Sequence, residues 1–198
     1  MIITYYWPPA GGPGVQRVLK FVKYLPQFGW EPIVLTVANG EYPAIDHSLE
    51  KDIPEGIKVY KTKTIEPFSI FKKLTGKTKE AKLDTYLISK KSGGFFEKIS
   101  IWLRLNLFIP DARVGWMYFG LKDGKRIIKK EGVSLILTSS PPHSVQLIGL
   151  LLSKKTKIPW VADFRDPWAE IVYYQNVKRN IISERFDGFL EKRVLKKA

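Results

Sequence analysis

The hydrophobic residues of this chain fall into two alternating patterns. Short runs of β-branched and aliphatic residues, typical of buried strands, alternate with stretches in which hydrophobic residues recur every three or four positions, typical of helices with one buried face. We predict strands at Ile2–Tyr6, 32–37, Ile57–Tyr60, Val133–Thr138 and Ile158–Phe164. We predict helices from Val15 to a glycine cap at Gly29, at Trp116–Lys130, at His143–Lys154 and from about Ile181 to Ala198, with further helical character at Ile99–Leu107.

Helical spacing also predicts which side chains are buried. The first helix should bury Val15, Val18, Leu19, Val22 and Leu25. The helix at 116–130 should bury Tyr118, Leu121, Ile127 and Ile128, and the last helix carries Phe186, Phe189, Leu190 and Val194 on one side. Residues 66–100 show no clear pattern and are expected to form helical pieces and a lysine-rich loop.

This alternation of strands and helices predicts an α/β fold with a Rossmann-like, doubly wound and mostly parallel sheet. The run at 133–138 is hydrophobic on both faces, as central parallel strands are. Ligands of such sheets bind beyond the carboxyl ends of the strands. The loops that follow Tyr6, Thr138 and Phe164 are therefore the places to look for a site.

Composition excludes several classes of protein. The chain has no cysteine and two histidines, which excludes a disulfide scaffold and disfavours a metal site. The N-terminus lacks the basic start and long apolar stretch of a signal peptide, and no apolar run is long enough to span a membrane. We expect a soluble, cytoplasmic domain.

The net charge is +14, and much of it lies in one stretch. Between Lys58 and Lys98 there are eleven lysines and four acids, and aromatic residues lie in and after the same stretch. Basic residues mixed with aromatics suit an anionic membrane surface or nucleic acid, although a solvated lysine-rich face is an equally good interpretation. Arginine, which reads phosphates and bases best, is absent from the stretch.

The first loop contains Gly11, Gly12 and Gly14 immediately before a helix. Glycines let the backbone approach a ligand, and the free N–H groups at a helix start favour an anion. Gln16 or Arg17 could add a donor to a diphosphate or a carboxylate. The loop matches neither the dinucleotide fingerprint nor the P-loop, which disfavours hydride-transfer enzymes and Walker-type ATPases. A tight strand-to-helix turn without a ligand is the alternative.

The second loop runs from Ser139 to Ser144. Ser140 is predicted to cap the following helix, with Pro141 at its first position and His143 at its third. The helix dipole would keep His143 neutral near pH 7 and able to accept a proton or donate a hydrogen bond. A histidine of the capping turn without a chemical role is the alternative.

The third loop contains Asp163, Arg165 and Asp166 at the end of a buried strand. Burying charged groups in that position costs free energy unless they form ion pairs or act on a ligand. The carboxylates could orient sugar hydroxyls, and one could act as a base. Arg165 could offset phosphate charge or pair with Asp163 as a structural salt bridge.

Four segments together resemble the N-terminal domain of the family 4 glycosyltransferases of the GT-B fold: YYWPPAGGPGVQR, FIPDARVGW, LTSSPPHS and IPWVADFRDPW. The resemblance covers essentially residues 1–198. It implies an acceptor-side, Rossmann-like domain whose C-terminal, nucleotide-sugar-binding partner domain is absent from this chain. Many members carry a histidine where this sequence has Arg165, which leaves His143 or Asp166 as substitutes for it.

The resemblance implies that a sugar is transferred with retention from a nucleotide-diphosphate sugar to a glycan or lipid-linked acceptor, as in cell-surface polysaccharide synthesis. It also implies that Gly11 and Gly12 lie near the donor diphosphate and the reacting sugar. We predict Gly14, Arg17, Ser140 and Asp163 as further substrate contacts, and His143, Arg165 and Asp166 as catalytic residues. No cofactor is implied, because the nucleotide-sugar is a co-substrate. The reaction of this family is generally metal-independent, which suits the missing metal ligands. The basic surface would fit an acceptor at an anionic membrane, with the protein peripheral on its inner face and without a nucleic-acid partner.

Two other functions compete with this one. A basic α/β module that binds a membrane or nucleic acid without catalysis would explain the charge alone. An epimerase-like enzyme that modifies a sugar nucleotide would require a dinucleotide fingerprint, and none is visible.

Overall fold

The structure is a computed structural model that describes residues 1–66, 102, 105–169 and 179–198. The predictions for residues 67–100, for most of the helix expected at 99–107 and for most of the lysine-rich stretch lie outside these residues.

The sheet has five strands, all parallel, in the order β3-β2-β1-β4-β5. This order confirms the predicted Rossmann-like α/β fold. The neighbouring strands β1 and β4 are followed by crossovers in opposite directions, so the crevice between their carboxyl ends is the position at which such sheets bind ligands. The strands are β1 Ile2–Ile3, β2 Ile33–Val37, β3 Lys58–Thr62, β4 Ile136–Ser140 and β5 Trp160–Phe164.

Most strand boundaries lie one to three residues from the predicted ones, and β1 and β4 differ most. Strand β1 ends at Ile3 instead of Tyr6. Strand β4 begins later and continues through Ser139 and Ser140, which pair with Asp163 and Phe164 of β5. Hydrophobicity could not locate this end, because serines continue the strand wherever the partner strand continues beside them.

The predicted helices are present. They are α1 Pro13–Tyr24, α4 Met117–Glu131, α5 Ser144–Thr156 and α7 Ile181–Leu195. The first predicted helix continues beyond α1 as the 3-10 helix η1 Leu25–Phe28, which ends at Gly29 in the left-handed conformation, as predicted. Two further 3-10 helices were not predicted, η2 His47–Asp52 and η3 Val114–Trp116. In the described part of the chain, no helix is long and apolar enough to cross a lipid bilayer.

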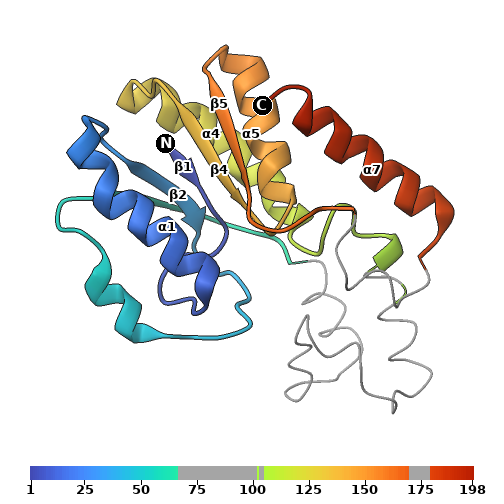
Figure 1. The fold of residues 1–198 in the computed structure, drawn as a ribbon, viewed down its shortest axis with the longest axis horizontal. Helices are drawn as coiled ribbons and strands as arrows, with labels where there is room; N and C mark the ends of the chain where they lie inside the picture. Colours follow the sequence, from blue (N-terminus) through green and yellow to red (C-terminus); the bar gives the residue numbers. More distant parts are fainter. Residues whose placement is uncertain (67–101, 103–104, 170–178) are drawn as a thin grey trace.

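The helices form a layer on each face of the sheet, and each layer has its own hydrophobic core (Figure 1). Side chains of β1 alternate between them, since Ile2 packs toward α1 and Ile3 packs toward α4 and α5. Helix α7 packs on the outer side of α5. The carboxyl ends of the strands are left between these layers, where the candidate loops lie.

Burial agrees with the predicted pattern for α1 and in part for α4 and α7. Val15, Val18, Leu19 and Val22 are buried and Leu25 is partly buried. Three predictions are wrong, because Tyr118, Phe186 and Phe189 are exposed. In α7 the inward positions are occupied by Ser183, Asp187 and Val194. Polar residues can take such positions when they form buried hydrogen bonds, which periodicity does not reveal.

Two glycines in helices give a direct test of this packing. A Cβ at Gly149 of α5 would lie 2.4 Å from Trp160 Nε1 and 2.5 Å from Thr138 Cγ2, whereas one at Gly188 of α7 would meet no atom within 4 Å. We expect Gly149→Ala to lower the free energy of unfolding by about 1–3 kcal/mol through overpacking. Gly188→Ala should raise it by up to about 1 kcal/mol, since alanine favours the helix. Chemical denaturation measures both, and equal effects would contradict the helix–sheet contact at Gly149.

Candidate functional site

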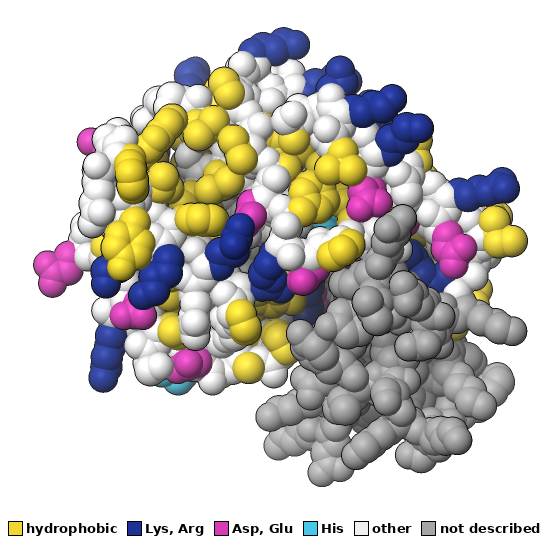
Figure 2. Space-filling view, in the orientation of Figure 1, with side chains coloured by type: hydrophobic (Ala, Val, Ile, Leu, Met, Phe, Trp, Pro, Cys, Tyr) yellow, Lys and Arg dark blue, Asp and Glu magenta, His cyan; other side chains and the backbone are white. Residues whose placement is uncertain are grey.

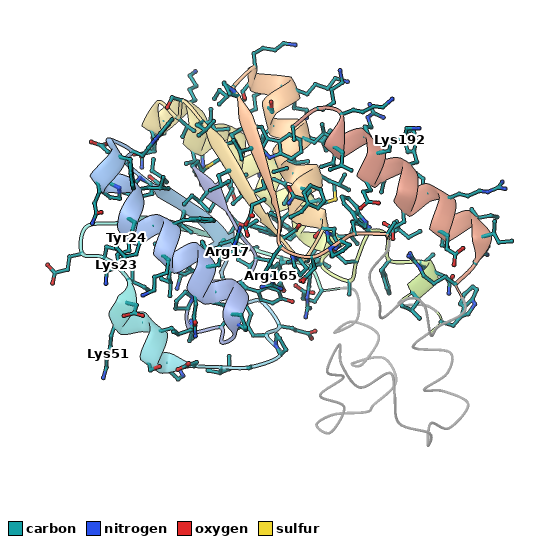
Figure 3. The ribbon with its side chains drawn as sticks, viewed as in Figure 1. Arg17, Lys23, Tyr24, Lys51, Arg165 and Lys192 are labelled. Atoms are coloured by element: carbon teal, nitrogen blue, oxygen red, sulfur yellow. The ribbon has the colours of Figure 1, made fainter. Side chains whose placement is uncertain are left out.

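The first and third loops meet at the carboxyl edge of the sheet. Gly14 is the second residue of α1, and the guanidinium of Arg165, just after β5, lies directly over it: a Cβ at Gly14 would be 1.8 Å from Arg165 Nη1. Figure 3 shows Arg17 and Arg165 close together between α1 and the end of β5. The absence of a side chain at Gly14 is what lets this cation approach the start of the helix.

The glycine loop is fixed by backbone contacts with residues 44–46. The Gly11 N–H donates to the Ala44 carbonyl (2.9 Å), and the Asp46 N–H donates to the Pro9 carbonyl (2.8 Å). Gly12 is the N-cap residue of α1 and has φ +108°, a conformation that side chains disfavour. No side chain caps α1. Pro13 has no N–H and the Val15 N–H donates to the Gly12 carbonyl (3.1 Å), so the Gly14 N–H is the helix amide left to a ligand at this positive end of the dipole.

Arg17 and Asp163 join α1 to β5. Arg17 donates from Nε (2.9 Å) and Nη2 (2.7 Å) to the two oxygens of Asp163, and Ser139 Oγ also donates to Asp163 Oδ2 (2.8 Å). The predicted alternative in which Arg165 pairs with Asp163 is therefore wrong. Both Asp163 oxygens are engaged, so this carboxylate is better suited to holding the edge together than to binding sugar hydroxyls.

The protonation state of Asp163 fits this structural role. Burial alone raises the pKa of Asp163, but the hydrogen bonds from Arg17 and Ser139 and the charges of Arg17 and Arg165 outweigh it. The net result is a pKa below the usual value, so Asp163 is ionised at neutral pH and unsuited to act as a base there.

Arg165 and Asp166 are the charged pair that remains accessible. Arg165 Nη2 and Nε lie 3.2 and 3.3 Å from Asp166 Oδ2, and the side chains are 31% and 43% exposed. An exposed pair of adjacent residues with such long contacts is weak. Either group can therefore turn to a ligand at little cost, unlike Arg17, which is held by two hydrogen bonds.

His143 lies at the same edge but on the α5 side of the sheet. Its ring is stacked on Trp168 at 4.8 Å and 10° and packs against Phe164 at 6.4 Å. Burial lowers its pKa to about 4, with Asp166 opposing and Arg165 adding to the shift. The imidazole is neutral at pH 7, as predicted, but burial is the cause rather than the helix dipole. A base of such low pKa is weak at neutral pH.

The start of α5 differs from the prediction. Helix α5 begins at Ser144 with His143 as its N-cap residue, so His143 is not at the third helical position. Ser140 belongs to β4 and does not cap the helix; its Oγ accepts a hydrogen bond from Gln146 Nε2 (2.9 Å) and is buried. The structure therefore gives Ser140 an internal partner and no exposed position at the site.

Asp111 is a residue of this edge that sequence reasoning missed. Its Oδ2 accepts from the Ser144 N–H (2.7 Å), and its Oδ1 accepts from Ser144 Oγ (3.0 Å) and the Arg113 N–H (2.8 Å). The carboxylate thus occupies the N-terminus of α5 as an internal cap, while the N-terminus of α1 has no side-chain cap. Of these two helix starts, α1 is the better candidate for an external anion.

Arg113 organises a buried network beneath the edge and was also missed. It donates to Glu66 Oε2 (2.6 Å), Glu41 Oε2 (3.1 Å) and the Glu41 carbonyl (2.9 Å), and its guanidinium lies over the ring of Tyr5. The Tyr5 hydroxyl donates to Glu66, and burial raises the pKa of Tyr5 so that it keeps this proton. The network ties the segments that follow β1, β2 and β3 to one another. A hint was present in the sequence, since Asp111 and Arg113 are charged residues between apolar ones.

A second buried ion pair supports the aromatic stack on His143. Asp187, which is fully buried, accepts from Trp168 Nε1 (2.6 Å) and Arg179 Nη1 (2.9 Å). Arg179 Nε also donates to the Leu105 carbonyl (3.1 Å). Helix α7 therefore holds Trp168 in place, and through it the ring of His143.

Among the residues that the structure describes, no three histidine, cysteine or acidic side chains lie close enough together to hold a metal ion.

A scan of the sequence against models of known protein families finds no match, and a search among curated proteins finds no similar sequence. The structure shows a Rossmann-like α/β protein with a five-stranded, all-parallel sheet in the order 3-2-1-4-5.

Proposed function

We propose that this chain is the acceptor-side domain of a retaining glycosyltransferase that moves a sugar from a nucleotide-diphosphate sugar to a hydroxyl of a glycan or lipid-linked acceptor. The observation that carries the proposal is the meeting of the uncapped start of α1 with the accessible guanidinium of Arg165 over Gly14. Helix N–H groups and an arginine together favour a diphosphate.

The residues then take distinct roles. Arg165, the Gly14 N–H and the dipole of α1 stabilise the negative charge that develops on the departing diphosphate. Asp166, whose carboxylate is accessible, accepts a hydrogen bond from a hydroxyl group of one of the two substrates, the sugar that is transferred or the molecule that receives it. Arg17, Asp163 and Ser139 hold α1 against the sheet, so that these groups keep their positions.

His143 takes a supporting role in this proposal. Its ring is buried in the stack with Trp168, and the low pKa keeps it uncharged. It therefore positions the loop that bears Asp166 rather than exchanging a proton with substrate. The catalytic role expected of His143 from sequence remains the less favoured assignment.

Diphosphate binding tests the site without requiring turnover. We expect pyrophosphate or a nucleoside diphosphate to bind residues 1–198 about 10- to 100-fold more weakly after Arg165→Met, because a charge-assisted hydrogen bond is lost. Gly14→Ala should act similarly, since the new methyl group displaces the same guanidinium. Titration calorimetry measures the affinities, and Lys51→Met removes an exposed cation elsewhere as a control. Unchanged diphosphate affinity in both site variants would show that Arg165 does not bind the diphosphate.

Turnover tests the wider proposal. Residues 1–198 alone should not transfer sugar, because the nucleotide-sugar-binding half of the cleft is supplied by a second domain. Robust turnover by this chain alone with any nucleotide-sugar would contradict the two-domain assignment. In a protein that combines both domains, Gly12→Val should greatly reduce turnover, since φ +108° disfavours a β-branched residue and the side chain would crowd a bound ligand.

A further inference from the structure

Helix α7 exposes a row of large hydrophobic side chains. Ile182, Phe186 and Phe189 are 75%, 49% and 53% exposed, although the opposite side of the helix is anchored through Asp187 and Val194. Their spacing of four and three residues places them in one row, and the rings of Phe186 and Phe189 stack at 6.4 Å. Burial within the domain therefore does not explain why these three positions are hydrophobic.

Cations accompany this row, and acids lie on another flank of the helix. Arg193 lies over the ring of Phe189 at 6.0 Å, and Arg185, Lys192 and Lys196 are also exposed. Glu191, on that other flank, accepts a hydrogen bond from the Trp168 N–H (3.2 Å). Apolar side chains with cations beside them are the pattern of a helix that lies in a membrane interface.

Helix α4, in the same layer of helices, presents a second cationic face. Exposed side chains at helical spacing line a shallow, open depression on it: Lys122, Lys125, Arg126, Lys129 and Lys130. Tyr118, at the start of the same face, is 67% exposed. Asp123 pairs with Arg126, and Glu131 pairs with Lys58 and contacts Lys130 (3.6 Å), so the positive charge of this face rests mainly on Lys122, Lys125 and Lys129.

Both helices pack against α5 on the side of the sheet opposite α1. Figure 2 shows further Lys and Arg side chains along the rim formed by α7 and the end of α5. The last turns of the three helices each carry two cations: Lys129 and Lys130, Lys154 and Lys155, and Lys192 and Arg193. The layer thus combines one apolar row with a broad field of positive charge.

We infer that this helical layer docks on an anionic lipid surface, with Ile182, Phe186 and Phe189 entering the headgroup region and the cations of α4 and α7 contacting lipid phosphates. Three side chains offer much less apolar area than the roughly 800 Å² per partner of a stable protein interface. They are sufficient for an interfacial helix when cations add attraction. Lysine predominates on α4, which suits a diffuse layer of charge rather than the readout of one phosphate group.

The inference does not depend on sugar transfer and is tested with the chain itself. Residues 1–198 should cosediment with vesicles of equimolar phosphatidylglycerol and phosphatidylcholine, and only weakly with pure phosphatidylcholine. The triple variant Ile182→Ser, Phe186→Ser, Phe189→Ser should bind the anionic vesicles at least about tenfold more weakly. The variant Lys122→Glu, Lys125→Glu, Lys129→Glu should also lose at least about tenfold, and binding should fall as salt increases.

Two matched controls lie away from this layer. The triple variant Tyr24→Ser, Phe28→Ser, Trp30→Ser removes a similarly exposed apolar set, and Lys20→Glu, Lys23→Glu, Lys51→Glu makes the same change of charge. Figure 3 shows Lys23, Tyr24 and Lys51 on the side of α1 and η2, far from Lys192 of α7. Both controls should bind within about twofold of the unmodified chain. Circular dichroism checks that each variant is folded.

Several results would overturn the inference. These are equal binding to neutral and anionic vesicles, equal losses in the controls and the α4 and α7 variants, or no binding to anionic vesicles at low salt. Nucleic acid that binds the α4 face more tightly than vesicles would assign the surface to a different partner. A dimer that dissociates with the α7 variant would assign it to a second copy of this chain.

Discussion

Replacing Arg113 by alanine should lower the free energy of unfolding by about 3–5 kcal/mol, because the buried Glu66 carboxylate would lose its cation. The side chains of Arg113 and Glu66 are only 14% and 5% exposed, and their closest contact is 2.6 Å. Water cannot replace the guanidinium at little cost in such a place. The loss should also loosen Glu41 and Tyr5, which share the network.

Equilibrium denaturation in urea measures this effect, and Arg126→Ala is the matched control. Arg126 is 74% exposed and pairs with Asp123 within one helix, so its removal should change stability by at most about 0.5 kcal/mol. The double variant Arg113→Ala, Glu66→Gln should recover part of the loss, since the unpaired charge is gone. A loss for Arg113→Ala no larger than that for Arg126→Ala would show that the network does not stabilise the fold.

Acidification should destabilise the protein through His143, by about 3 kcal/mol between pH 6.5 and pH 4. The pKa of His143 falls from an ordinary value of 6.5 to about 4 because its ring is buried. Between these two pH values, His143 is protonated in the unfolded chain and neutral in the folded chain. This contribution to stability is fully present above pH 6.5 and is lost progressively as the pH falls toward 4.

The variant His143→Phe isolates this effect, since phenylalanine keeps the stack on Trp168 but cannot be protonated. We expect the difference in unfolding free energy between the unmodified protein and the variant to change with pH across this window. The difference also cancels other groups, including the Met1 amino group, whose pKa burial lowers to about 6. Parallel stability profiles for the two proteins would show that His143 is solvated rather than buried.

Much of the fold could be predicted from local patterns. The spacing of Val15, Val18, Leu19 and Val22 gave the correct buried face of α1, and the apolar runs located the five strands to within a few residues. Glycine and proline residues in the sequence located the first loop before α1 and the third loop after β5. The structure brings Gly14 and Arg165 together there. Parallel strands then required these loops to share one edge of the sheet.

The partners of the charged residues could not be predicted in the same way. Asp163 could pair with Arg165, two residues away in the sequence. Instead it binds Arg17 of helix α1, 146 residues away in the sequence. Alternation along β5 decides this, because Asp163 faces α1 while Phe164 faces His143 and Trp168. Asp111 and Arg113 had no predicted role, since Ser144, Glu41 and Glu66 are distant in sequence.

The sequence by itself therefore determined the α/β class, the parallel sheet and the edge of the sheet that the first and third loops share, because these follow from periodicity and from turn-forming residues near one another in the chain. Only the tertiary structure decided which arginine remains accessible, which helix start is already capped, and that Phe186 and Phe189 face outward. Those outcomes depend on contacts between segments far apart in sequence, where burial and geometry select one partner among several of similar chemistry.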